Sequence, residues 1–83
     1  MEARVRNIQT AFGLSVRACR KRLGLSQEEL AAISGLHRTY IGSVERGERN
    51  VTLQNIFVLA HSLRTSASDL IIETEKNSEA NER

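Results

Sequence analysis

The side chains best suited to specific chemistry lie together near the middle of the chain. Arg38, Thr39 and Ser43 share one side of a short predicted helix, opposite the apolar residues Ile41 and Val44. Their guanidinium and hydroxyl groups can form hydrogen bonds with base edges, and an α-helix is narrow enough to enter the DNA major groove. The chemistry that this segment favours is therefore recognition of a hydrogen-bonding surface, not a bond-making reaction.

Reactive groups form no recognisable catalytic or metal-binding pattern. Cys19 is the only cysteine, which excludes an intramolecular disulfide and any zinc site built from several thiolates. It falls on the apolar side of a predicted helix, where an inert buried thiol is more common than a redox sensor. His37 and His61 are distant in the sequence, without a carboxylate or second thiol at ligand spacing. We expect no catalytic residue, no metal ion, no cofactor and no small-molecule ligand.

The composition is that of one small helical domain. The chain has 83 residues, 40% of them hydrophobic, with three aromatic residues and no proline, which favours aliphatic packing between helices. So short a chain has no room for a deep substrate cavity beside its core, which argues against an enzyme. The longest apolar run is residues 56–60, and no apolar leader opens the sequence. We therefore expect no membrane contact and a cytoplasmic location.

The net charge of +2 is unevenly distributed along the chain. Residues 1–50 carry nine Lys or Arg against five Asp or Glu, whereas residues 66–83 carry two against five. A basic body with an acidic end is typical of a protein that presents one surface to a polyanion. An accidental split in a small protein would look the same, so the charge distribution alone does not decide the function.

Apolar spacing and capping residues predict the first two helices. Apolar positions three and four residues apart predict a helix from about residue 7 to residue 23, which Gly24 ends with a left-handed cap. Ser26 and Glu29 have the spacing of a capping box, which opens a second, short helix. Gly35 ends this second helix.

Three more helices are expected. The third covers residues 38–46 and ends at Gly47, and the fourth begins after Thr52 and buries a wide apolar face up to Leu63. This face consists of Leu53, Ile56, Phe57, Leu59, Ala60 and Leu63. The fifth helix starts at Ser66 or Ser68 and runs through residue 72.

The last eleven residues differ in composition from the rest. From Glu73 onward no apolar residue is larger than alanine, so this segment cannot bury itself against the core. We therefore expect residues 1–72 to form an all-α domain, a compact five-helix bundle, and residues 73–83 to be a charged, disordered tail.

The second and third predicted helices, joined by a tight turn that contains Gly35, make a helix-turn-helix arrangement. Four short motifs occur in a fixed order around it: RACR at 17–20, GLSQEELA at 24–31, SGL at 34–36 and VERG at 44–47. On these motifs the sequence, over about residues 12–72, resembles the phage-repressor (XRE, Cro-like) helix-turn-helix family. The resemblance implies a lambda-repressor-like fold and sequence-specific binding of double-stranded DNA.

Within that family, residues 37–52 are most similar to the controller proteins of restriction-modification systems. These are small dimeric regulators that time the expression of an endonuclease and of their own gene. His37 departs from the pattern, because controller proteins often carry an acidic residue there and His is a poorer helix cap than Asp. The resemblance implies a prokaryotic or phage regulator that binds its own promoter, and RNA polymerase as a further partner if the protein activates.

The third helix is expected to read bases. Arg38 at its start can donate two parallel hydrogen bonds to a guanine, and Thr39 can offer a hydroxyl to a base or a methyl to thymine. Ser43 lies further along the same side; it and Thr39 could also be simple polar surface. The resemblance adds Gln27, at a position where family members touch phosphate or a base edge.

Other polar residues are expected to grip the DNA backbone or to support the fold. The backbone candidates are Tyr40, Arg46, Arg49, Asn50 and, more weakly, Arg17. Tyr40 has an equal alternative, in which its ring packs under the following loop. The resemblance pairs Arg20 with Glu45 in a structural salt bridge between the first and third helices.

A homodimer is expected because one domain touches only about four or five base pairs. The apolar residues Leu70, Ile71 and Ile72 exceed what a five-helix core needs and are the candidates for a self-complementary interface. Alternatively, two of them finish the core of the monomer. No effector domain is visible in the sequence, so we expect protein concentration to be the regulatory input.

A protein-binding function is the alternative. An antitoxin-type regulator uses the same fold to repress its operon and to neutralise a partner protein. The acidic segment from Glu73 would suit a basic partner, but it offers no bulky apolar anchor for tight binding.

Overall fold

The computed structural model describes the backbone of residues 2–82 and the side chains of residues 7–78. All of the regular secondary structure in this range is helical, which confirms the predicted all-α, five-helix fold. Among the described residues, no helix has the length and apolar character that a membrane crossing needs. The helices are α1 (Glu2–Arg22), α2 (Gln27–Ser34), α3 (Arg38–Glu45), α4 (Leu53–Ser62) and α5 (Ala67–Glu82).

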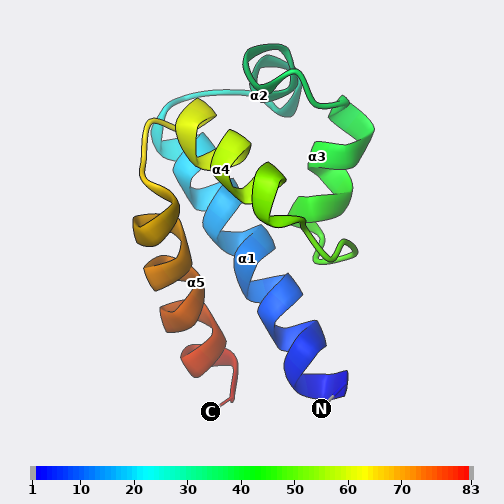
Figure 1. Ribbon diagram of the computed structural model, residues 1–83, viewed down its shortest axis with the longest axis vertical. Helices are drawn as coiled ribbons and strands as arrows, with labels where there is room; N and C mark the ends of the chain where they lie inside the picture. Colours follow the sequence, from blue (N-terminus) through cyan, green and yellow to red (C-terminus); the bar gives the residue numbers. More distant parts are fainter. Residues whose placement is uncertain (1, 83) are drawn as a thin grey trace.

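The long helix α1 packs against α5 and α3 (Figure 1). Helix α5 runs antiparallel along one side of it, and α3 contacts it as well. Helices α2 and α4 contact each other, and α4 also contacts α5. Helix α1 begins at Glu2, about five residues earlier than predicted, since neither proline nor glycine interrupts residues 2–12.

The predicted start signals cap their helices. The Ser26 side chain accepts a hydrogen bond from the Glu29 backbone N–H at 3.0 Å, and Glu29 accepts one in return from the Ser26 N–H. Thr52 caps α4 in the same manner through Asn55 N–H at 3.1 Å. The Ser66 hydroxyl accepts from the Asp69 N–H, which decides between the two predicted starts of α5. These bonds satisfy backbone donors that a helix start leaves unpaired.

The core is made of aliphatic residues contributed by all five helices. The fully buried members include Val16, Leu30, Ile41, Leu59 and Leu70, one from each helix. They form a single cluster, which the aromatic ring of Phe12 joins. Burying such side chains is the main favourable contribution to folding.

The prediction that α4 buries a wide apolar face is only half right. Leu59 and Ala60 are buried, but Leu53 is 72% exposed and Phe57 is 59% exposed. Leu53 and Phe57 are four residues apart and therefore share one stripe on the outer side of the helix. The core of this small domain has room for only one stripe of α4, and the second apolar stripe faces outward.

The expectation of a disordered tail from Glu73 onward is wrong, because α5 continues to Glu82. Three polar residues hold this extension against α1. Thr74 Oγ1 lies 3.2 Å from Ser15 Oγ, and Asn77 Nδ2 donates to Ser15 Oγ at 3.0 Å. Ser15 and Thr74 are buried. We call this group of Ser15, Thr74 and Asn77 the polar seam. Residue 83 lies outside the described residues.

The seam explains why apolar content alone was misleading. Composition arguments assume that a segment is ordered by burying large apolar side chains. Here hydroxyl and amide groups bond to each other and to the α1 backbone, where Ser15 Oγ donates to Ala11 O at 3.0 Å. Such a network orders a helix when each of its members finds a partner.

Helix α3 approaches α1 at backbone distance. A methyl group added at Gly13 would collide with the Val44 carbonyl oxygen and lie 2.7 Å from that of Glu45. On the same side, Gly47 has a φ of +76° and passes so close to Thr10 that a Cβ would lie 2.8 Å from the Thr10 Cα. Only glycine permits this approach, which places the end of α3 directly on α1.

Gly13→Ala is therefore expected to lower the free energy of unfolding by about 1 to 3 kcal/mol or more, because the added methyl group meets backbone that cannot rotate away. Urea unfolding followed by circular dichroism measures this. Arg17→Ala, an exposed change one turn further along α1, is the control and should change stability little. Equal stability of the Gly13→Ala protein and the parent would contradict the close approach.

Candidate nucleic-acid interface

Helix α3 presents its first turn to solvent. Arg38 and Thr39 are exposed there, and neither side chain bonds to another side chain in the part of the chain that the structure describes. His37 occupies the N-cap position without making a side-chain hydrogen bond to the helix, as expected for a weak capping residue. The two predicted base-reading residues are thus available at the end of α3 that enters a groove first in helix-turn-helix proteins.

A buried ion pair holds the other end of α3 in place. Arg20 on α1 donates to both carboxylate oxygens of Glu45, at 2.7 and 2.9 Å, and its third hydrogen bond reaches Leu25 O at 2.8 Å. The two side chains are only 10% and 4% exposed. The hydrogen bond to Glu45 raises the pKa of the Arg20 guanidinium. This is the pair that the family resemblance implies.

Gln27 extends this ion pair to α2. Its side-chain amide donates to Glu45 Oε1 at 3.1 Å, and the residue is partly buried. The Gln27 side chain also packs beside Gly42 in the middle of α3, where a Cβ would lie 3.6 Å from its side-chain oxygen, an ordinary van der Waals contact. The side chain of Gln27 is therefore oriented by Glu45 before any DNA arrives.

The expectation that Ser43 lies on the exposed side of α3 is wrong. Ser43 is 5% exposed; its hydroxyl donates to the Tyr40 carbonyl oxygen at 2.7 Å and accepts from Arg49 Nε at 3.0 Å. The loop after α3 returns over this residue, since the Glu48 N–H donates to Ser43 O at 2.9 Å. Ser43 consequently has no free surface with which to read a base.

Tyr40 takes the packing role that was considered for it, and its predicted contact with the DNA backbone remains a prediction. Its half-buried ring packs against the core, and its hydroxyl accepts a hydrogen bond from Asn55 Nδ2 on α4 at 3.0 Å. The Arg49 guanidinium lies over the ring, 5.5 Å from its centroid, within the range of a cation–π interaction. The tyrosine therefore links α3, the loop and α4, with one edge still reaching the surface.

The loop between α3 and α4 carries two arginines in different electrostatic states. Arg46 donates to both oxygens of Glu48, at 3.0 and 3.2 Å, and both side chains are exposed. The hydrogen bond from Arg46 lowers the pKa of Glu48, so this carboxylate is charged and offsets the arginine at neutral pH. Arg49 has no such anionic partner among the described residues. Asn50 is exposed beside it.

Arg17 is exposed on α1. It stands four residues after Gly13 and three before Arg20, and both of these contact α3. Helical spacing thus puts Arg17 on the side of α1 that faces α3. Its placement is compatible with the predicted contact to a phosphate at the edge of an α3 interface.

The three residues predicted as a dimer interface do not act together. Leu70 is fully buried in the core and is removed from that set, whereas Ile71 is 39% exposed and Ile72 is 47% exposed. Helical geometry separates them, since consecutive residues point about 100° apart. Leu53 and Phe57 on α4, which the sequence placed in the core, are exposed as well, because an amphipathic pattern does not distinguish exposed apolar residues from core residues.

Asn55 and Glu48 are the other residues that sequence reasoning missed. Both act through partners that lie near them only after the loop has folded, Tyr40 for Asn55 and Arg46 for Glu48. Only Glu48 has a local signal, because an acid two residues from an arginine in a turn can pair with it.

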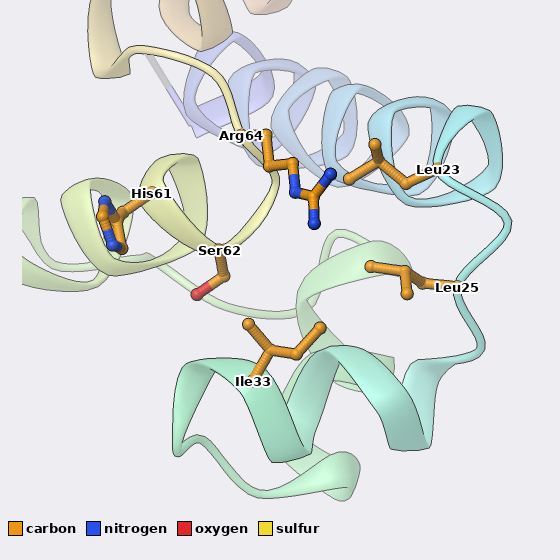
Figure 2. A pocket seen from close by; sticks show the side chains of 6 residues that line it. All are labelled: Leu23, Leu25, Ile33, His61, Ser62 and Arg64. Atoms are coloured by element: carbon orange, nitrogen blue, oxygen red, sulfur yellow. The ribbon is translucent and has the colours of Figure 1, made fainter.

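A surface hollow of about 520 Å³ lies between the end of α1, helix α2 and the end of α4 (Figure 2). Leu23, Leu25 and Ile33 line it together with His61, Ser62 and Arg64. The Ser62 hydroxyl donates to the Val58 carbonyl oxygen at 2.8 Å, so it is engaged within its own helix. None of the predicted DNA-contacting residues lines this hollow.

The remaining groups that could react or bind a metal are the Cys19 thiol and the His, Asp and Glu side chains. Burial, together with the nearby Glu73 carboxylate, raises the pKa of the Cys19 thiol, which keeps it protonated at neutral pH. The described residues contain no group of three or more His, Cys, Asp or Glu side chains arranged to bind a metal ion.

Comparison with known proteins agrees with this geometry. A helix-turn-helix family model matches residues 16–70. Control protein C.SmaI of Serratia marcescens is 55% identical over 65 residues, covering 78% of this chain and 77% of the relative. Control protein C.BamHI of Bacillus amyloliquefaciens is 46% identical over 66 residues, covering 78% of this chain and 82% of the relative.

Solved structures give the same result. The restriction-modification controller protein C.AhdI from Aeromonas hydrophila superposes with a TM-score of 0.73 at 50% identity, covering 75% of this chain and 94% of that one. The controller protein C.Esp1396I, solved as a tetramer with its natural 35 base-pair operator, gives a TM-score of 0.78 at 28% identity and covers 86% and 93% of the two chains.

The chain therefore belongs to the helix-turn-helix family of DNA-binding regulators. Within this family its relatives are the control proteins of restriction-modification systems. These relatives do not support the antitoxin alternative.

Replacing Glu45 tests the central ion pair. Glu45→Ala leaves the buried Arg20 guanidinium without its anionic partner, and we expect a loss of about 3 to 5 kcal/mol in the free energy of unfolding. Thermal or urea denaturation measures the loss. Glu48→Ala, which removes an exposed carboxylate from the other arginine pair, is the matched control and should change stability little. Similar losses for the two variants would show that burial of the Arg20 pair is unimportant.

Proposed function

We propose that this protein is a sequence-specific transcriptional regulator that binds an operator in the promoter of its own gene and controls a restriction-modification system. The observation that carries the proposal is the exposed first turn of α3, with Arg38 and Thr39 free, on a helix whose opposite end is held by the buried Arg20–Glu45 pair. The 55% identity to a control protein supports it. We assign no catalytic activity and a cytoplasmic site of action.

Reading and positioning are divided between different residues. Helix α3 enters the major groove, where Arg38 donates to a guanine and Thr39 contacts the neighbouring base. Gln27, held by Glu45, meets a phosphate or base edge at the start of α2. The backbone contacts come from Tyr40, Arg46, Arg49, Asn50 and Arg17.

The binding species is a homodimer on a palindromic site, with half-site centres about 34 Å apart. The surface that suits a second copy combines the outer stripe of α4 with the exposed isoleucines of α5. Leu53, Phe57, Ile71 and Ile72 are between 39% and 72% exposed, and burial of such side chains against a second copy would favour dimerisation. The operator complex of C.Esp1396I, in which that relative is a tetramer, supports oligomeric binding.

Regulation then follows from protein concentration. Dimerisation and DNA binding are coupled equilibria, so occupancy of the operator rises steeply as the protein accumulates. If the bound dimer activates transcription, RNA polymerase is its second partner. A promoter-reporter titration with a hyperbolic response would argue against this coupling.

A gel-shift titration on the DNA upstream of the protein's own gene, at fixed physiological salt, tests the function. We expect a sharp shift at nanomolar dimer that unrelated competitor DNA does not remove. Arg38→Ala should cost about 1 to 3 kcal/mol on this site and relax preference at one base pair, with non-specific binding nearly unchanged. Weak, sequence-indifferent binding by the parent protein would overturn the proposal.

Arg49→Ala is the companion variant, and a different result is expected. It should weaken binding to all sequences alike and reduce the slope of log affinity against log salt by about one unit. The division between reading and positioning is wrong if the Arg38 and Arg49 variants behave in the same way.

The dimer surface is tested with Phe57→Glu. A carboxylate in the centre of an apolar interface should leave the protein monomeric at concentrations where the parent is dimeric, as measured by sedimentation equilibrium. Its helical content should be unchanged, since Phe57 is not part of the core. Leu14→Glu, at an exposed apolar position of α1 outside this surface, is the control and should stay dimeric. A dimeric Phe57→Glu protein would contradict the assignment.

A further inference from the structure

Arg49 is held by two residues of α3 even though it lies outside that helix. Its Nε donates to the buried hydroxyl of Ser43 at 3.0 Å, and its guanidinium lies 5.5 Å from the centroid of the Tyr40 ring. Ser43 in turn donates to the carbonyl oxygen of Tyr40 at 2.7 Å. One hydrogen bond and one ring face together restrict a side chain that normally samples many rotamers.

The two residues that hold Arg49 are themselves fixed. Ser43 is 5% exposed, and both of its hydrogen bonds run to named partners. The Tyr40 hydroxyl accepts from Asn55 on α4 at 3.0 Å, so the ring is anchored at both ends. The position of Arg49 is therefore set by α3 and α4 together, not by the loop that carries it.

Among the described residues, no carboxylate forms a hydrogen bond with Arg49, although, besides the hydrogen bond from Arg46, its charge contributes weakly to lowering the pKa of Glu48. Ser43 and Tyr40 are neutral and take up only Nε and one face of the guanidinium. The neighbouring Arg46 differs, because the Glu48 carboxylate takes two of its hydrogen bonds and offsets its charge. Of these two loop arginines, Arg49 is the one in which orientation is restricted while charge is retained.

We propose that Ser43 is a positioning residue for DNA binding: with the Tyr40 ring it orients Arg49 before the operator arrives, so that the two terminal nitrogens of Arg49 meet the DNA without first losing rotamer freedom. Ser43 itself does not touch DNA. The inference rests on the proposed function, in which Arg49 contacts the DNA backbone. It replaces the base-reading role that the sequence predicts for Ser43.

A double-mutant cycle tests the inference by gel-shift titration on the upstream DNA. Immobilising one long side chain costs enough that Ser43→Ala should weaken binding by roughly threefold to tenfold in the parent background. In the Arg49→Ala background the same change should have no effect, because there is no arginine left to orient. A purely structural role of Ser43 would weaken binding equally in both backgrounds and would overturn the inference.

The salt dependence provides a second readout. Arg49→Ala should reduce the slope of log affinity against log salt by about one unit, because a phosphate contact is lost. Ser43→Ala should leave the slope nearly unchanged, since the arginine and its charge remain. A reduced slope in Ser43→Ala alone would mean that the contact is lost entirely, and would count against a role in orientation.

Ser62→Ala is the matched control. Ser62 is also buried, at 7% exposed, and its hydroxyl also donates to a carbonyl of its own helix. It lines the hollow of Figure 2, which no residue of α3 lines. Operator affinity should be unchanged by Ser62→Ala, and circular dichroism should show that all variants are folded. A loss equal to that of Ser43→Ala would overturn the inference.

The outcomes distinguish this inference from the proposed function. If the parent protein does not bind the upstream DNA selectively, the proposed function fails. If the parent binds but Arg49→Ala changes neither affinity nor salt slope, the role of Arg49 fails, and the inference fails with it. If Arg49→Ala weakens binding while Ser43→Ala does so equally in both backgrounds, only the positioning role of Ser43 is wrong.

Discussion

The buried ion pair between Arg20 and Glu45 is the interaction on which the candidate interface depends. Removing two charges from water is costly, and hydrophobic residues of similar size would often be as stable. The pair instead fixes the relative orientation of the helices. Its hydrogen bonds join α1, the residue before the α2 cap and the last turn of α3, and the hydrogen bond from Gln27 to Glu45 connects α2 to the same pair. With Gly13 allowing backbone contact beside it, the end of α3 has one position relative to α1.

An interface built on such a support can be small and still selective. The exposed turn of α3 offers only a few side chains, so their value depends on how accurately they are held. Binding energy lost to ordering is reduced when side chains and helices are ordered beforehand. The Arg20–Glu45 pair orders helix α3 in this way. Glu45 orders the side chain of Gln27, and the contacts with Ser43 and Tyr40 order that of Arg49.

Local signals predicted local structure well, and tertiary contacts explain the failures. The capping residues Ser26 and Thr52 stand where short-range hydrogen bonding requires them. Ser43 was predicted to be exposed, but the loop after α3 returns over it. The contacts of this loop involve Tyr40, Asn55 and Arg49, and helical spacing in the sequence does not predict them. Phe57 was taken as core because the apolar pattern of a helix does not show whether one apolar residue faces its own domain or the outside. The contacts predicted with DNA remain predictions.

The polar seam between α1 and α5 restricts how these two helices can be aligned along each other. Two apolar helices can slide past each other by a turn and still bury comparable surface. Ser15, Thr74 and Asn77 are mutually satisfied at one alignment only. In a pair displaced by one turn, the hydrogen bonds between the helices would be lost. The Ser15 and Thr74 hydroxyls would keep only the bonds to carbonyls of their own helices, and the Asn77 amide would lose its bond to Ser15, which is unfavourable. The seam thus specifies the register of α5, and through it the place of Ile71 and Ile72 on the surface.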